Sequence, residues 1–259
     1  MKKLTFKFFN IHFKLVPKNI LFSIYKGKII FITTVNLQFL YISKFDQKFR
    51  NILSNSLNTI DAQPLFWILY LRILKFKSYL SRNSGSELIF DFLQFASKND
   101  KSVFLLGGTA KSNFLACNYI SKNYTCKVSG FSPEYSALPF PAHTTQVLFQ
   151  EVTAFKPDIL LVGFGAPKQE FWINDNLSYL NQLGIKYVAG IGGTFDMLAG
   201  LVVPAPLFIK SIGLEWIWRF LQEPFTRIRP VAQRLHVVPS LLFQRVFHAK
   251  IDSIDFDNE

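Results

Sequence analysis

The sequence predicts an α/β fold in which a mainly parallel sheet is flanked by helices. Short runs rich in Val, Ile and Leu alternate with longer helical segments, the order typical of parallel strands joined by crossover helices. Two of these runs, Ile159–Val162 and Tyr187–Ile191, lead directly into glycine-rich loops. Because ligands collect at the carboxyl ends of parallel strands, these loops predict a ligand site at one edge of the sheet.

Composition limits the possible classes of protein. The chain has 259 residues, 49% of them hydrophobic and 18% charged, which is within the globular range. We expect an α/β domain over 1–200 and a basic, amphipathic, helical appendage over 201–259. The net charge of +12 favours an anionic partner. Cys117 and Cys126 lack metal-ligand spacing and indicate a reducing compartment.

The N-terminal third predicts two strand ends that carry polar side chains. The expected elements are an edge strand at Phe8–Leu15, a short helix at Lys18–Tyr25, a strand at Lys28–Thr34, one helix at Leu37–Leu57, a strand end at Thr59–Ala62 and a helix at 65–80. Thr34 and Asn36 lie at the carboxyl end of the strand expected at Lys28–Thr34, where they either bind a ligand or cap the next helix. Asp61 lies in the strand end expected at Thr59–Ala62, where it is either a functional carboxylate or a helix cap before Pro64.

The middle of the chain repeats a pattern of strand, glycine loop and helix. We expect helices at Glu87–Ser97, Ala110–Ser121 and Thr145–Ala154, strands at Ser102–Leu106 and Cys126–Ser129, and a proline-rich loop at Phe131–His143. Gly107-Gly108-Thr109 and Gly163–Pro167 each precede a helix start, where backbone amides can bind an anion. Lys168, Gln169 and Glu170 follow the second loop directly. The alternative is that these loops only end strands, since neither contains a complete dinucleotide-binding or P-loop pattern.

The character of the sequence changes after Gly200. We expect no further strand, a helix at Lys210–Gln222 with aromatic residues on more than one face, and a frayed acidic end from Asp252. Basic and apolar residues are interleaved along the tail, as in a helix lying on an anionic bilayer. An ordinary docking helix is the alternative. No apolar run is as long as the roughly 18 residues of a membrane span, and no nucleic-acid-binding motif is present.

Three ordered motifs resemble the WecG/TagA/CpsF glycosyltransferases. They are Val162–Glu170 (VGFGAPKQE), Gly190–Gly200 (GIGGTFDMLAG) and Gly213–Arg219 (GLEWIWR), the last followed by Glu223-Pro224. Shorter matches at Ile32–Asn36, at Arg82 with Ser84-Gly85, and at Leu105–Gly108 fall in the same order, so that the resemblance covers roughly residues 8–230.

The resemblance implies a Rossmann-like fold and an inverting sugar transfer. The donor is a UDP-sugar of the N-acetylmannosamine type, and the acceptor is N-acetylglucosamine on undecaprenyl diphosphate. It also implies a peripheral enzyme on the cytoplasmic face of the membrane, working in surface-polysaccharide or teichoic acid-type synthesis. Two positions depart from the pattern, because Ala62 stands where glycine follows the aspartate and Pro204 stands where arginine is usual. A catalytically impaired nucleotide-sugar-binding module is therefore the alternative.

The resemblance and the strand ends together assign the site. Asp61 occupies the position of the family's proposed base, and Asn36 and Thr34 position the reacting sugar. Arg219, Arg227 and Arg229 meet the lipid diphosphate or the anionic membrane surface. No metal or other cofactor is expected, since no Asp-x-Asp cluster lies near the strand ends and the aspartates of the C-terminal end, Asp252 and Asp255 among them, are misplaced for this role. The expected substrate-binding residues are Arg82, Gly107, Gly108, Thr109, Gly163, Gly165, Pro167, Lys168, Gln169, Glu170, Gly192, Gly193, Thr194 and Asp196.

Overall fold

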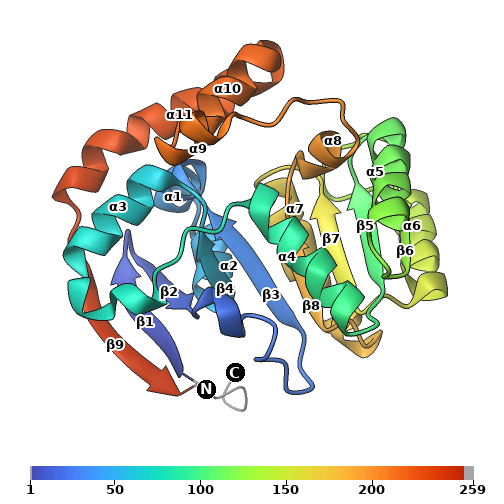
Figure 1. Cartoon of the computed structure of the whole chain (residues 1–259), viewed down its shortest axis with the longest axis horizontal. Helices are drawn as coiled ribbons and strands as arrows, with labels where there is room; N and C mark the ends of the chain where they lie inside the picture. The colour runs from blue at the N-terminus through green and yellow to red at the C-terminus, as the bar shows by residue number, and fades with distance from the viewer. Residues whose placement is uncertain (1, 254–259) are drawn as a thin grey trace. The chain divides into compact units, whose positions relative to one another are not determined.

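The computed structural model describes residues 2–253, apart from the side chains of Leu207, Thr226, Arg227 and Ser253. The chain forms two compact units (Figure 1). Unit 1 comprises Met1–Ile24, Thr33–Ser84 and Val203–Glu259, and unit 2 comprises Tyr25–Ile32 and Gly85–Val202.

The predicted mainly parallel sheet is confirmed. Its six strands have the order β4-β3-β8-β7-β5-β6, and the pairs β3–β8, β8–β7, β7–β5 and β5–β6 are all parallel. The strands β3, β5 and β7 are buried almost throughout because each is a short run rich in Ile, Val or Leu, whereas β6 at the edge of the sheet is half-buried. Their bounds are Ile30–Val35 (β3), Leu57–Ile60 (β4), Val103–Gly107 (β5), Val128–Phe131 (β6), Ile159–Gly163 (β7) and Tyr187–Gly190 (β8).

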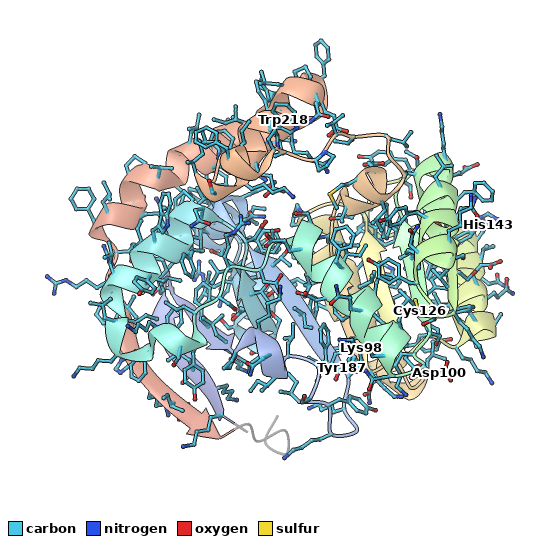
Figure 2. The ribbon with its side chains drawn as sticks, in the orientation of Figure 1. Lys98, Asp100, Cys126, His143, Tyr187 and Trp218 are labelled. Atoms are coloured by element: carbon cyan, nitrogen blue, oxygen red, sulfur yellow. The ribbon has the colours of Figure 1, made fainter. Side chains whose placement is uncertain are left out.

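Five helices belong to unit 2 and flank its strands: α4 (Gly85–Lys98), α5 (Ala110–Asn123), α6 (Ala142–Phe155), α7 (Lys168–Gln182) and α8 (Thr194–Leu198). Large aromatic side chains fill the core beneath them, among them Phe92, Phe104, Tyr187 and Phe195. His143, at the start of α6, is exposed (Figure 2). Aromatic packing of this kind accounts for part of the 29 phenylalanines in the chain.

The helices of unit 1 are shorter than the sequence suggests. The single helix expected over Leu37–Leu57 is wrong: Asp46 adopts an extended conformation and accepts a hydrogen bond from the Phe49 amide at 2.9 Å, so a second helix begins there. The helix expected at 65–80 also breaks, at Ile73. The elements are a 3-10 turn at Lys18–Ile20 (η1), α1 (Leu37–Phe45), α2 (Gln47–Asn55), α3 (Gln63–Arg72) and a 3-10 segment at Leu74–Tyr79 (η2).

A second sheet in unit 1 was not predicted. It has the order β2-β1-β9 and is antiparallel, with β1 at Lys2–Phe8, β2 at Ile11–Leu15 and β9 at Phe247–Ser253. The expected edge strand is thus a hairpin, which turns at Phe9 and Asn10 with positive φ angles of 52° and 59°. The expectations of no strand after Gly200 and of a frayed Asp252 are wrong. Asp252 Oδ2 accepts a hydrogen bond from Thr5 Oγ1 at 2.6 Å.

Three C-terminal helices complete unit 1: α9 (Leu207–Ser211), α10 (Glu215–Gln222) and α11 (Pro224–Phe243). The helix expected at Lys210–Gln222 is broken at Gly213, where φ is +75°. Within this unit α11 packs against α1 and α3 (Figure 1). The indole N–H of Trp218 (Figure 2) donates to the Val203 carbonyl at 2.9 Å and fastens α10 to the incoming chain. Within residues 2–253 none of the helices combines the length and the apolar character needed to span a bilayer.

Candidate active site

Asp61 lies in unit 1, in the short connection between β4 and α3. Its amide donates to the Val35 carbonyl at 2.9 Å, which fixes the backbone beside the end of β3. Ala62 takes the N-cap position of α3 with φ −81° and ψ 124°, and no side chain caps that helix. The alternative that Asp61 is a helix cap is therefore wrong. Ala62 adopts an ordinary extended conformation, so this loop does not require glycine.

Asn36 reaches both the following helix and Asp61. Its Oδ1 accepts hydrogen bonds from the amides of Gln38 at 2.9 Å and Phe39 at 3.2 Å, so it caps α1. Its Nδ2 lies 3.5 Å from Asp61 Oδ2, a long hydrogen bond that orients the carboxylate. Thr34 is buried at the end of β3. The capping alternative thus holds for Asn36, and the same side chain also supports Asp61.

Charged side chains surround Asp61 within the same unit. The pKa of Asp61 is raised to about 6, chiefly by burial and next by the nearby Glu215 carboxylate, whereas Arg234, the Asn36 hydrogen bond and Arg82 oppose the rise. Arg82 forms a parallel β-bridge with Ile60, and its Nη1 lies 3.9 Å from Glu215 Oε2. A carboxyl group with a pKa just below neutrality is mostly ionised at pH 7 and still able to accept a proton, as a general base requires.

Sequence reasoning did not assign Glu215 and Arg234 to this cluster. Glu215 carried a signal, since it is one of only two acidic residues between Lys210 and Lys250. Arg234 carried none, because α11 holds several arginines and only the packing of that helix selects one. Both residues come from helices more than 150 residues away from Asp61 along the chain.

In unit 2, Gln169 joins the two glycine loops that follow β7 and β8. Its Oε1 accepts hydrogen bonds from the amides of Gly165 and Gly192, each at 3.1 Å. Its Nε2 donates to Glu170 Oε1 at 2.7 Å. Only 2% of Gln169 is exposed. The structure therefore makes Gln169 an internal brace between the loops, whereas we expected it to face a ligand.

Glu170 lies beneath the same loops, 1% exposed. Burial raises its pKa to about 7, although the hydrogen bonds from Gln169 and from the Glu170 amide oppose the rise. Its Oε2 has no hydrogen-bond partner among the described residues. Gly190 leaves the space that this pair occupies, because a Cβ atom there would lie 2.5 Å from Gln169 Nε2 and 2.7 Å from Glu170 Oε1.

Several amides expected to bind phosphate already have acceptors within unit 2. The Gly108 amide donates to the Gly163 carbonyl at 3.0 Å, and the Thr109 amide donates to Ser112 Oγ at 2.9 Å in a capping box that starts α5. With Gly165 and Gly192 held by Gln169, four of the expected amides are engaged. The loops thus satisfy these four backbone groups themselves, and the binding of an anion by these residues stays a prediction.

Close packing explains two further glycines. A Cβ atom at Gly107 would lie 2.7 Å from the Phe164 ring, and one at Gly163 would lie 2.6 Å from the Phe195 ring. Thr194 Oγ1 donates to the Ile191 carbonyl at 2.6 Å, while the Asp196 carbonyl accepts from the Leu201 amide at 2.9 Å. These contacts shape the turn, and a ligand-binding role for Gly193, Thr194 and Asp196 stays a prediction.

Lys168 is turned toward the proline-rich loop of unit 2. Its Nζ donates to the Ser136 carbonyl and lies 4.5 Å from the centre of the Phe140 ring and 5.0 Å from that of Tyr135. Burial lowers the pKa of this lysine. Pro167 is the N-cap of α7. The structure thus gives Lys168 a role in holding the loop, and its contact with substrate stays a prediction.

The three arginines assigned to the lipid diphosphate all lie on the C-terminal helices. Arg219 is on α10 and Arg229 is exposed on α11. Arg227 is also in α11, but its side chain lies outside the described residues. Among the residues that the structure describes, no group of three or more His, Cys, Asp and Glu side chains is arranged to hold a metal ion.

Comparison with known proteins agrees with the motifs. The Glycosyl transferase WecG/TagA/CpsF family matches residues 1–251. An N-acetylglucosaminyldiphosphoundecaprenol N-acetyl-beta-D-mannosaminyltransferase of Staphylococcus aureus (strain MRSA252) is 33% identical over 140 residues, 54% of this chain and 52% of the relative. The corresponding protein of strain MW2 is 32% identical over 142 residues, 55% and 53% of the two chains. The chain thus spans about half the length of these relatives in the match. Since the family match covers nearly the whole chain, the chain belongs to the WecG/TagA/CpsF family of glycosyl transferases.

Proposed function

We propose that the chain transfers an N-acetylmannosamine-type sugar from a UDP donor to N-acetylglucosamine on undecaprenyl diphosphate, with inversion at the anomeric carbon. Family membership supports a glycosyl transfer, and the activity for which the relatives are named supports the acceptor and the sugar. The observation that carries the proposal is Asp61, a carboxylate that caps no helix and whose pKa is raised to about 6.

Asp61 is the proposed base. It takes the proton from the acceptor hydroxyl as that oxygen forms a bond to the anomeric carbon of the donor, and the bond from that carbon to the diphosphate oxygen breaks. The electron pair leaves with UDP, so stabilising the departing charge is the second requirement. Asn36 holds the carboxylate through its 3.5 Å contact. Removing a general base usually costs about 10²–10⁴-fold in rate.

The glycine loops after β5, β7 and β8 are the proposed binding region for the donor. Their tight turns and close packing suit an approach of backbone to a diphosphate, although four of their amides are engaged within the chain. We assign the contact to the remaining backbone groups of these loops, with the starts of α5 and α7 supplying a favourable dipole. No metal is required in this scheme.

We further propose that the C-terminal helices meet an anionic membrane on the cytoplasmic side. Large apolar side chains of α11 are exposed, including Phe225 at 95% and Phe243 at 84%, and Arg229 is exposed between them. Apolar and cationic groups on one segment favour the bilayer interface. Charge reversal at Arg229 should weaken co-sedimentation with anionic liposomes at moderate salt, and unchanged co-sedimentation would argue against this role.

The transfer is tested by incubating the protein with a panel of UDP-sugars and a short-chain, diphosphate-linked N-acetylglucosamine acceptor, and weighing the product. Asp61→Asn should lose at least about a hundredfold in turnover, while UDP binding measured by calorimetry stays close to that of the wild type. Wild-type turnover by this variant would remove Asp61 as the base.

A catalytically impaired binding module remains a second candidate because of one observation. Pro204 replaces the arginine usual in the family, and no guanidinium stands at that position to grip a phosphate. Binding of a UDP-sugar without any product in the same panel would favour this candidate.

A further inference from the structure

The start of α10 is held against the loop that carries Asp61. Gly213 precedes α10 with φ +75°, and a Cβ atom added there would collide with the Gln63 side chain in the first turn of α3. Glycine at this position therefore allows the backbone before α10 to rest directly on α3. Glu215 is the first residue of α10, and its carboxylate lies near enough to Asp61 to act on it electrostatically.

Glu215 also has a cationic partner that belongs to the Asp61 cluster. Arg82 Nη1 lies 3.9 Å from Glu215 Oε2, and the exposed fractions of the two side chains are 17% and 24%. The Asn83 amide donates a hydrogen bond to the carbonyl of Ile60, the residue before Asp61, at 2.9 Å. This bond anchors the backbone of the neighbouring Arg82 beside Asp61. An ion pair that is largely shielded from water acts on its neighbours more strongly than an exposed pair does.

We propose that Glu215 is a positioning residue of the site: paired with Arg82 at the start of α10, it sets the charge that Asp61 experiences. This inference rests on the proposed function, in which Asp61 is the general base. The groups facing Asp61 are Asn36 from α1, Arg82, Glu215 from α10 and Arg234 from α11. Glu215 is the one acid among them, so it opposes ionisation of Asp61, and the two arginines favour it.

The test is a titration of Asp61 that needs no substrate. In full-length protein labelled with carboxyl-¹³C aspartate, the Asp61 resonance is assigned by its loss in Asp61→Asn and followed against pH. Glu215→Gln should move the Asp61 titration to lower pH. Glu223→Gln is the matched control, because it removes the same charge from the other end of α10, about 12 Å along the helix from Glu215.

Two further variants keep the result decisive. Glu215→Asp retains the charge and should keep the titration nearer to that of the wild type. If Glu215→Gln does not fold, Arg82→Gln replaces it and should move the titration upward, since Arg82 lowers the pKa of Asp61. An unchanged titration in Glu215→Gln, or a shift of equal size in Glu223→Gln, overturns the proposal.

The reaction supplies a separate readout. The acid limb of kcat/KM should move to lower pH in Glu215→Gln by the same amount as the titration, and a limb that stays in place overturns the positioning role. If the wild type shows no transfer at all, the proposed function fails, while the shift of the Asp61 resonance still decides the electrostatic pairing.

Discussion

Replacing Glu170 by glutamine should make the stability of the protein less dependent on pH. The side chain is 1% exposed and its pKa is raised from 4.5 to about 7, chiefly by burial. At about 1.4 kcal/mol per pKa unit, this rise corresponds to about 3 kcal/mol. Glutamine has nearly the same shape and carries no charge at any pH, so the variant lacks this term.

The sign follows from proton binding. Below pH 4.5 the carboxyl is protonated in both the folded and the unfolded wild type. Between pH 4.5 and 7 the unfolded chain releases this proton and the folded chain keeps it, so folding becomes less favourable as pH rises. Above about pH 8 both states are ionised and the difference is constant. The wild type should therefore lose about 3 kcal/mol relative to Glu170→Gln between about pH 4 and pH 9.

Urea unfolding followed by circular dichroism over this pH range measures the difference. The glutamine amide makes different hydrogen bonds from the carboxyl group, and this can offset the free energy of unfolding by an amount that is the same at every pH. Such an offset does not affect the comparison, which concerns only the change with pH. Glu151→Gln, on the exposed surface of α6, is the matched control and should give a difference constant to within about 0.5 kcal/mol. If the wild type and Glu170→Gln unfold with parallel pH dependence, Glu170 is solvated or paired in the folded state and the reasoning is refuted.

Two other contacts give predictions of the same kind. Gln169→Leu removes the oxygen that accepts hydrogen bonds from the Gly165 and Gly192 amides, and each amide left without a partner should lower the free energy of unfolding by roughly 1–3 kcal/mol. Hydrogen exchange at these two amides should become faster in this variant. Gln182→Leu, at an exposed position of α7, is the control and should leave the exchange unchanged. Arg72→Ala removes the guanidinium that donates to the Leu241 and Leu242 carbonyls at 3.2 and 2.7 Å. Arg72→Ala should therefore speed proteolysis at the end of α11, whereas Lys75→Ala, at an exposed position, should not. Equal rates of proteolysis in the two variants would contradict the role of Arg72 in holding the end of α11.

The parallel sheet could be predicted because its strands are encoded locally. Ile29–Ile32 and Ile159–Val162 are continuous apolar runs, and the strands expected at Lys28–Thr34 and Ile159–Val162 form within two residues of their expected bounds. β9 could not be predicted, because its sequence, FHAKIDS, mixes charged and apolar residues. It becomes a strand by pairing with β1, more than 200 residues earlier in the chain. Non-local pairing of this kind leaves little trace in local propensity.

The candidate site divides in the same way. Asp61 and Asn36 were found because they follow strands, and polar groups collect at the carboxyl ends of parallel strands. Glu215 was not assigned, since its place beside Arg82 depends on how α10 packs. Gln169 was assigned to a ligand because it is the middle one of three long polar residues that directly follow a glycine loop. Instead two loops, distant in sequence, bring their amides to its one carbonyl oxygen.

The central claim is that Asp61 is the base of a sugar transfer, and the pH dependence of that transfer tests it most directly. With a pKa of about 6, Asp61 is about nine-tenths ionised at pH 7 and about one-tenth ionised at pH 5. The account predicts that kcat/KM falls roughly tenfold between these values in the wild type. The residual rate of Asp61→Asn should lack this fall. A wild-type rate that is flat over this range, or the same acid limb in Asp61→Asn, would contradict the account.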